Sequence, residues 1–133
     1  PGDIMAAVIS DWFFRIPPIR IAEARAGGGR TWSYRFDYPA AEDNHRLGAC
    51  HGVEIPFVFD TIGLAEVRPR VGGACSQAVA DVVHQAWVDF ITGGNPGWPP
   101  YDTTTRTTGL LTDRISAVDD PAGDERVCWD AIR

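Results

Sequence analysis

The chain has 133 residues and a net charge of −6, and 44% of its residues are hydrophobic. This length and composition suit one folded domain with an apolar core, and they exclude a disordered or low-complexity chain. The basic residues are all arginines scattered through an acidic sequence, so we expect no nucleic-acid partner. No apolar run reaches the roughly 18 residues that a membrane span needs, so we expect no membrane span.

The sequence opens with two helical patterns. Apolar side chains recur at helical spacing between Asp3 and Phe14, and Pro17 and Pro18 are predicted to end this amphipathic helix. A second helix is predicted from Pro18 to about Ala26, because proline is tolerated in the first turn of a helix. Three consecutive glycines then predict its end.

A strand is predicted over Thr31–Tyr38, where large aromatic residues alternate with smaller or polar ones. The residues expected on one face are Trp32, Tyr34, Phe36 and Tyr38. Residues 39–50 are predicted as a loop. The apolar run "VEIPFVF" that follows is either a short strand or a short helix, because periodicity does not distinguish the two at this length.

The second half of the sequence contains its strongest helical pattern. A wide apolar stripe runs from Ser76, the expected N-cap, to about Thr92, and Trp87 and Phe90 are expected in the core. The residues before it, 60–74, are predicted to be irregular. A short strand over residues 109–113 and a last helix from residue 120 complete an α/β chain without an internal domain boundary.

Three cysteines, Cys50, Cys75 and Cys128, are widely spaced and form no paired motif. They favour a reducing compartment. The first residues lack the basic and apolar regions of a signal peptide, so we expect a cytoplasmic protein. A start at Pro-Gly-Asp also fits a piece of a longer protein or an expression product.

Other classes of site find little support in the sequence. The histidines His45, His51 and His84 show no metal-binding spacing, so no metal or cofactor is expected. Cys50 and His51 are adjacent, which turns their side chains apart and disfavours a thiol–imidazole pair. The triple glycine follows a helix and precedes a strand, which is the reverse of a phosphate-binding loop.

His51 is the candidate that remains, in the segment "GACHGVEIPFVF". Small neighbours, including Gly52, leave the backbone free to turn and the imidazole uncovered, which is typical of a loop that presents a working group. The apolar residues that follow are expected to anchor this loop to a core. On spacing alone, a hydrogen-bonded structural histidine remains the commoner alternative.

The sequence resembles the C-terminal part of the type B carboxylesterases, the cholinesterase-like branch of the α/β-hydrolase fold. The resemblance covers nearly the whole chain and rests on "SDWFFRIPPIRIAEA", "TWSYRFDYP", "LGACHGVEIPFVFD", "AWVDFITGGNPGWPPYD" and "ERVCWD". It implies a late sheet strand, a catalytic-histidine loop and packing helices. It also implies that His51 is the triad histidine, acting on a small-molecule carboxylic ester.

The same resemblance implies that Glu54 and Gly52 support the histidine loop. The family's triad acid lies upstream, so Glu54 is expected to support His51 without being that acid. Trp12, Phe13 and Phe14 are expected to pack in preference to lining a substrate gorge.

The nucleophile is missing from the sequence. None of its serines lies in the G-x-S-x-G context that this fold requires, and the oxyanion glycines are also absent. The expected partner is therefore the remainder of its own hydrolase domain, and the chain alone is expected to be inactive. The alternative is a segment of a non-catalytic binding module of the same fold.

Overall fold

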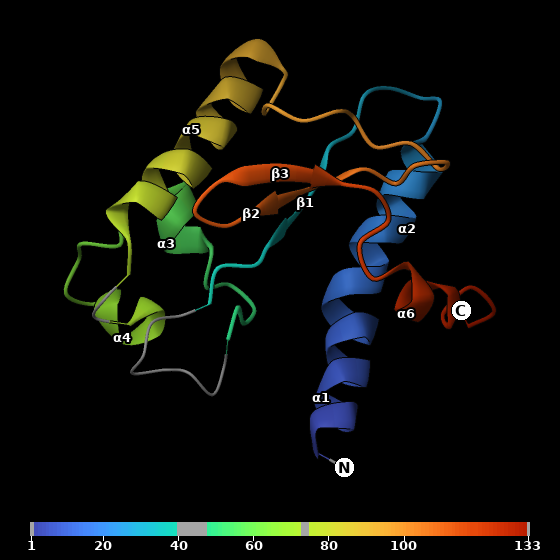
Figure 1. The fold of residues 1–133 in the computed structure, drawn as a ribbon, viewed down its shortest axis with the longest axis horizontal. Helices are drawn as coiled ribbons and strands as arrows, with labels where there is room; N and C mark the ends of the chain where they lie inside the picture. Colours follow the sequence, from blue (N-terminus) through green and yellow to red (C-terminus); the bar gives the residue numbers. More distant parts are fainter. Residues whose placement is uncertain (1, 40–47, 73–74, 133) are drawn as a thin grey trace. The chain divides into compact units, whose positions relative to one another are not determined.

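The computed structural model describes residues 2–39, 48–72 and 75–132 (Figure 1). These residues form two compact units. The first takes the residues up to Ser33, then Pro99–Thr108 and the residues from Val118 onward; the second takes Tyr34–Trp98 and Gly109–Ala117. Neither unit is continuous in sequence, and the expectation of a chain without an internal boundary stays a prediction.

The N-terminal helices are confirmed, but the two prolines do not separate them. Helix α1 spans Gly2–Ser10, a π-helical turn η1 spans Asp11–Arg15, and α2 spans Ile16–Arg25. The amide of Ile16 donates to the carbonyl oxygen of Asp11, five residues earlier, so helical backbone continues into α2. Both prolines then fall in the first turn of α2, where a missing N–H group is tolerated.

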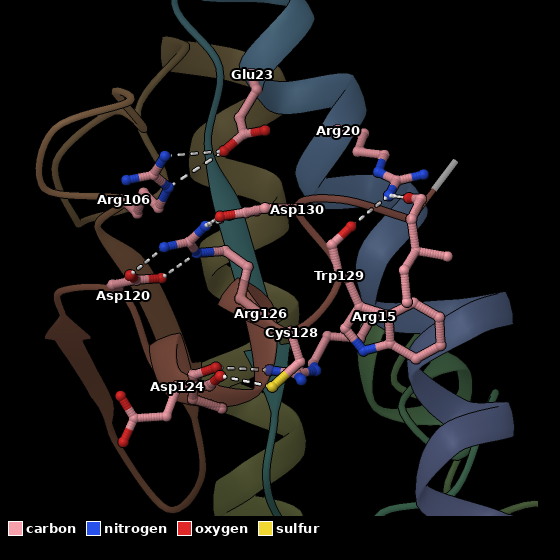
Figure 2. A network of polar contacts seen from close by, with 12 residues as sticks. Arg15, Arg20, Glu23, Arg106, Asp120, Asp124, Arg126, Cys128, Trp129 and Asp130 are labelled. Atoms are coloured by element: carbon pink, nitrogen blue, oxygen red, sulfur yellow. Dashed lines mark hydrogen bonds and ion pairs between the residues drawn. The ribbon is translucent and has the colours of Figure 1, made fainter.

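The end of the chain is held by charged hydrogen bonds to this helical stretch, within the first unit (Figure 2). The Arg15 guanidinium donates to both carboxylate oxygens of Asp11, at 2.7 and 2.8 Å, and to the carbonyl oxygen of Ala122 at 3.0 Å. The indole N–H of Trp129 donates to the same Asp11 carboxylate at 3.0 Å. Asp11 therefore joins two segments that are far apart in sequence.

Arg126 makes a second cluster of ion pairs in the same unit (Figure 2). It lies in α6, which spans Gly123–Val127, and its guanidinium donates to both carboxylate oxygens of Asp120 at 3.0 Å and to Asp130 at 3.2 Å. Arg106 reaches Glu23 of α2 at 3.1 Å. Because buried apolar side chains are few in the described part of this unit, directed polar contacts do much of the holding.

Three strands form one sheet in the order β1-β2-β3. Strand β1 spans Ser33–Phe36, β2 spans Thr108–Leu111 and β3 spans Ile115–Val118. The Thr108 hydroxyl lies 3.4 Å from that of Ser33, and Asp37 N–H donates to Leu111 O at 3.0 Å, so β1 and β2 run in parallel. The predicted strands are thus confirmed, with β1 shorter than expected; β3, which forms a hairpin with β2, was not predicted.

The aromatic face of β1 packs onto two helices of the second unit. The Phe57 ring lies 5.1 Å from that of Phe36 and 5.8 Å from that of Tyr38, and only 1% of Phe57 is exposed. Tyr34 meets Trp87 edge to face at 6.0 Å. Phe57 belongs to α3, Ile55–Val58, so the ambiguous apolar run is a helix.

Helix α5 spans Gln77–Gly93 and packs against α3 (Figure 1). Its buried residues are Val79, Ala80, Val83 and Ala86. Gly94 ends it in the left-handed conformation, with φ at +67°. Phe90, expected in the core, is 40% exposed, because the buried stripe lies on the N-terminal part of the helix. A helical turn, α4 over Arg68–Val71, interrupts the region predicted to be irregular.

The apolar side of the N-terminal helical stretch is exposed within the described residues. Its exposed large residues are Ile4, Met5, Val8, Ile9, Trp12, Phe13 and Phe14. The Trp12 ring lies against that of Trp129, with 5.7 Å between the ring centroids. Trp12, Phe13 and Phe14, which were expected to pack, are 46%, 63% and 47% exposed, so about half of their surface is not packed by the described residues. No helix in the described ranges is both long and apolar enough to cross a membrane.

Asp11→Asn should lower stability and flatten its dependence on acid. Hydrogen bonds from Arg15 and Trp129 hold the pKa of the Asp11 carboxyl below its ordinary value of 3.8. The stabilisation is therefore present above that value and is lost as the pH falls through the lowered pKa. We expect the variant to lose about 1–2 kcal/mol at neutral pH in urea unfolding, and to lose less than the parent chain on acidification.

Asp3→Asn is the matched control, because Asp3 is an exposed carboxylate on the same helical stretch. Its unfolding curves should follow those of the parent chain at each pH. An acid-induced loss of stability that is equally large in Asp11→Asn and in the parent chain would contradict the proposed ion pair.

Candidate active site

His51 lies at the corner of a tight turn. The Val53 amide donates to the carbonyl oxygen of Cys50 at 3.1 Å and closes the turn around His51 and Gly52. Gly52 has φ at +76°, a conformation that glycine adopts without strain and that the third position of a type II turn requires. His51 is exposed at this corner. The predicted turn at His51 is confirmed, and the presentation of its imidazole as a working group stays a prediction.

The turn leads directly into the buried part of the second unit. Val53 is buried, and the carbonyl oxygen of Glu54 accepts the amides of Phe57 and Val58 at 2.9 and 3.0 Å, which starts α3. Pro56 lies in the first turn of α3, where its lack of a backbone N–H group leaves no hydrogen bond unmade. Of the apolar residues predicted to anchor the loop, Phe57 is buried and Val58 is half-buried, but Ile55 and Phe59 are exposed, so the predicted anchor is confirmed at Phe57 and wrong at Ile55 and Phe59.

On the other side of the turn the described chain begins again at Gly48. His45 and most of the loop predicted before Cys50 lie outside the described residues. Cys50 is half-buried and carries a free thiol, as does Cys75, and the free thiol of Cys128 is exposed. Among the described residues, no group of three histidine, cysteine or acidic side chains is placed to hold a metal ion.

Glu54 is half-buried next to the turn, and its charge acts on Tyr34 of β1. Burial raises the pKa of the Tyr34 phenol above its ordinary value, and the negative charge of Glu54 adds to this rise. The sequence pattern placed Tyr34 on the face of β1 that carries Phe36, but it gave no sign of the link to Glu54. The predicted face shared by Tyr34 and Phe36 was the available signal of this link. Phe36 contacts α3, and Glu54 immediately precedes that helix.

His84 lies away from His51 in sequence but is tied to the same local structure. Its Nδ1 is 2.8 Å from the carbonyl oxygen of Val58, the last residue of α3. His84 is thus a half-buried side chain that caps the C-terminal end of α3.

Comparison with solved structures places this arrangement among the esterases with an α/β-hydrolase fold. A thermophilic PNB esterase matches with a TM-score of 0.79 and 27% identity, over 91% of this chain and 26% of that one. A Geobacillus stearothermophilus carboxylesterase matches with a TM-score of 0.77 and 30% identity, over 93% of this chain and 27% of that one. The predicted fold class is confirmed: the described residues form part of an α/β-hydrolase fold.

The model of the Carboxylesterase family matches residues 2–124, and the chain belongs to this family. It is 30% identical to the para-nitrobenzyl esterase of Bacillus subtilis (strain 168) in an alignment of 130 residues that covers 90% of this chain and 25% of that protein. It is 32% identical to the phenmedipham hydrolase of Pseudarthrobacter oxydans in an alignment of 110 residues that covers 76% of this chain and 22% of that protein. The chain thus spans about a quarter of the length of these relatives.

Gly52→Ala should loosen the turn that presents His51. An alanine at φ +76° is strained, at a cost of about 1 kcal/mol, although a Cβ atom there would find room beside Ile55 at 3.7 Å. We expect the Val53 amide, which closes the turn, to exchange its hydrogen about fivefold faster. Gly63→Ala is the control, since its Cβ atom would meet open space and its φ is not positive. Equal exchange in the two variants would contradict the assigned turn.

Proposed function

We propose that His51 is the general base and acid of a serine carboxylic-ester hydrolase. The observation that carries this proposal is the exposed imidazole at a glycine-dependent turn, fixed on one side by the buried α3. A triad histidine must reach the nucleophile and must also keep a fixed geometry. The turn supports the first need and the anchor supports the second.

In this reaction the imidazole accepts the serine proton as the serine oxygen attacks the ester carbonyl. It then returns a proton to the leaving alcohol, and a carboxylate holds its other nitrogen. The acyl group is then bound to the serine oxygen. The imidazole accepts a proton from a water molecule as that water attacks the acyl carbonyl, and it returns a proton to the serine oxygen as the carboxylic acid leaves. His51 would perform these transfers, and no cofactor is needed for them.

The serine, the triad acid and the oxyanion donors would come from the remainder of the hydrolase domain. Two observations support this partner: the relatives are about four times longer than this chain, and the apolar side of α1 and η1 is exposed. A contiguous exposed apolar face is normally covered by other protein. The substrate would be a small-molecule carboxylic ester, as the name of the para-nitrobenzyl esterase suggests, in a cytoplasmic enzyme.

Glu54 would support the turn, and it would not serve as the triad acid. Its carbonyl oxygen accepts the first amides of α3, and its negative charge adds to the rise in the pKa of the Tyr34 phenol. Gly52 would support the turn through its positive φ alone.

His51→Ala should abolish ester turnover in a protein that joins these residues to the nucleophile-bearing part of the domain. We expect kcat to fall by a factor on the order of 10³ or more, because the serine loses its base, with little change in the unfolding midpoint. Glu54→Gln should cost much less activity and should keep the acid limb of the pH–rate profile. Near-normal turnover in His51→Ala would refute the assignment, whereas a parent protein without ester turnover would favour the binding module.

The chain alone should not hydrolyse esters, because it lacks the nucleophile. With a short-chain aryl ester, its rate should equal that of the same chain carrying His51→Ala. A rate that exceeds this control would show that a nucleophile lies within the 133 residues.

A further inference from the structure

Helix α3 is one turn long, so its four carbonyl groups all belong to its C-terminal end and need outside partners. The residues just after the helix supply three of them. Phe59 N–H donates to Ile55 O at 3.1 Å, Thr61 N–H to Pro56 O at 2.8 Å, and Asp60 N–H to Phe57 O at 3.3 Å. The fourth carbonyl, that of Val58, is bound at 2.8 Å by the His84 side chain from α5.

The path of the chain explains why the fourth partner is a side chain. Asp60 has φ at +52°, a left-handed conformation that turns the backbone so that the Thr61 amide returns to Pro56. The Val58 carbonyl is thus left for a donor from another element. A backbone carbonyl can only accept, so the Nδ1 atom of His84 carries the proton.

We propose that His84 is a positioning residue for the turn that presents His51, an inference that rests on the proposed function of His51. A one-turn helix cannot hold its own direction, because too few internal hydrogen bonds fix it. Helix α3 packs against α5, its Phe57 ring packs under β1, and His84 binds its last residue at the Val58 carbonyl. Together they fix the direction in which α3 leaves the His51 turn.

His84 acts at a distance from the reacting groups in this arrangement. Its hydrogen bond ends on α3, whose first residue is four positions after His51. Losing that bond leaves the Val58 carbonyl without its donor and frees the end of α3 to move. The imidazole of His51 would then spend less time in the reactive geometry, which lowers the rate of proton transfer more than it weakens substrate binding.

Three variants separate this role from general stability. His84→Leu removes the donor and keeps a bulky helix-forming residue. His84→Asn keeps an N–H donor at about the place of Nδ1, so it should restore the bond. Gln85→Ala changes the neighbouring exposed residue, whose side chain binds Asp89 on the same helix, and serves as the control.

In the protein with its complete hydrolase domain, we expect His84→Leu to lower kcat about tenfold or more while KM stays within about twofold. His84→Asn should recover most of kcat, and Gln85→Ala should match the parent protein. In the chain alone, the Phe57 and Val58 amides, which start α3, should exchange faster in His84→Leu and near the parent rate in His84→Asn.

A His84→Leu variant with parental kcat and parental exchange, measured where His51→Ala is inactive, overturns this inference and leaves the proposed function standing. A His84→Asn variant as impaired as His84→Leu also overturns it, since the donated hydrogen bond is then not what matters. If His51→Ala stays active, the proposed function fails instead, and the exchange measurement still decides whether His84 holds α3.

Discussion

The buried ring of Phe57 is the contact on which the candidate site depends. It packs beneath Phe36 of β1 and beneath Tyr38, which follows that strand, and through α3 it fixes the chain that follows His51. His51 and Phe57 are only six residues apart in the sequence, so movement of the Phe57 ring would also move the turn that carries the His51 imidazole. A loop that must present a reactive group thus takes its rigidity from the sheet, through one aromatic side chain.

The two units are stabilised by different kinds of interaction. The second has a continuous apolar core, to which α3, α5 and the sheet all contribute. The first relies on guanidinium–carboxylate pairs, with Arg15 on Asp11 and Arg126 on Asp120. Paired hydrogen bonds of this kind are directional, so they fix the register between segments as well as their proximity. Non-directional apolar contacts would specify that register less sharply.

The periodic parts of the structure were predictable because their signals are local. Alternating aromatics identified β1 and its packed face, and the apolar stripe identified α5. The π-helical turn before Pro17 was not predictable, because apolar spacing does not show that the Ile16 amide bonds to the carbonyl five residues earlier instead of four. The helix at Phe57 and the His84 bond to Val58 depend on packing between distant segments, which spacing along the sequence does not encode. The resemblance identified His51, and the turn geometry explained its Gly52 neighbour.

The parallel pairing of β1 with β2 has a consequence for biosynthesis. The partner of Ser33–Phe36 is Thr108–Leu111, so the histidine turn, α3 and α5 all lie within the connection between two neighbouring strands. During translation β1 leaves the ribosome long before β2 exists, so the backbone edge of β1 stays without its hydrogen-bonding strand until β2 is made. Closing so long a loop is slow compared with forming a helix. The contacts that support the candidate catalytic turn involve only β1, α3 and α5, so they can form before β2 emerges, while the unpaired edge of β1 stays open to pairing with other chains.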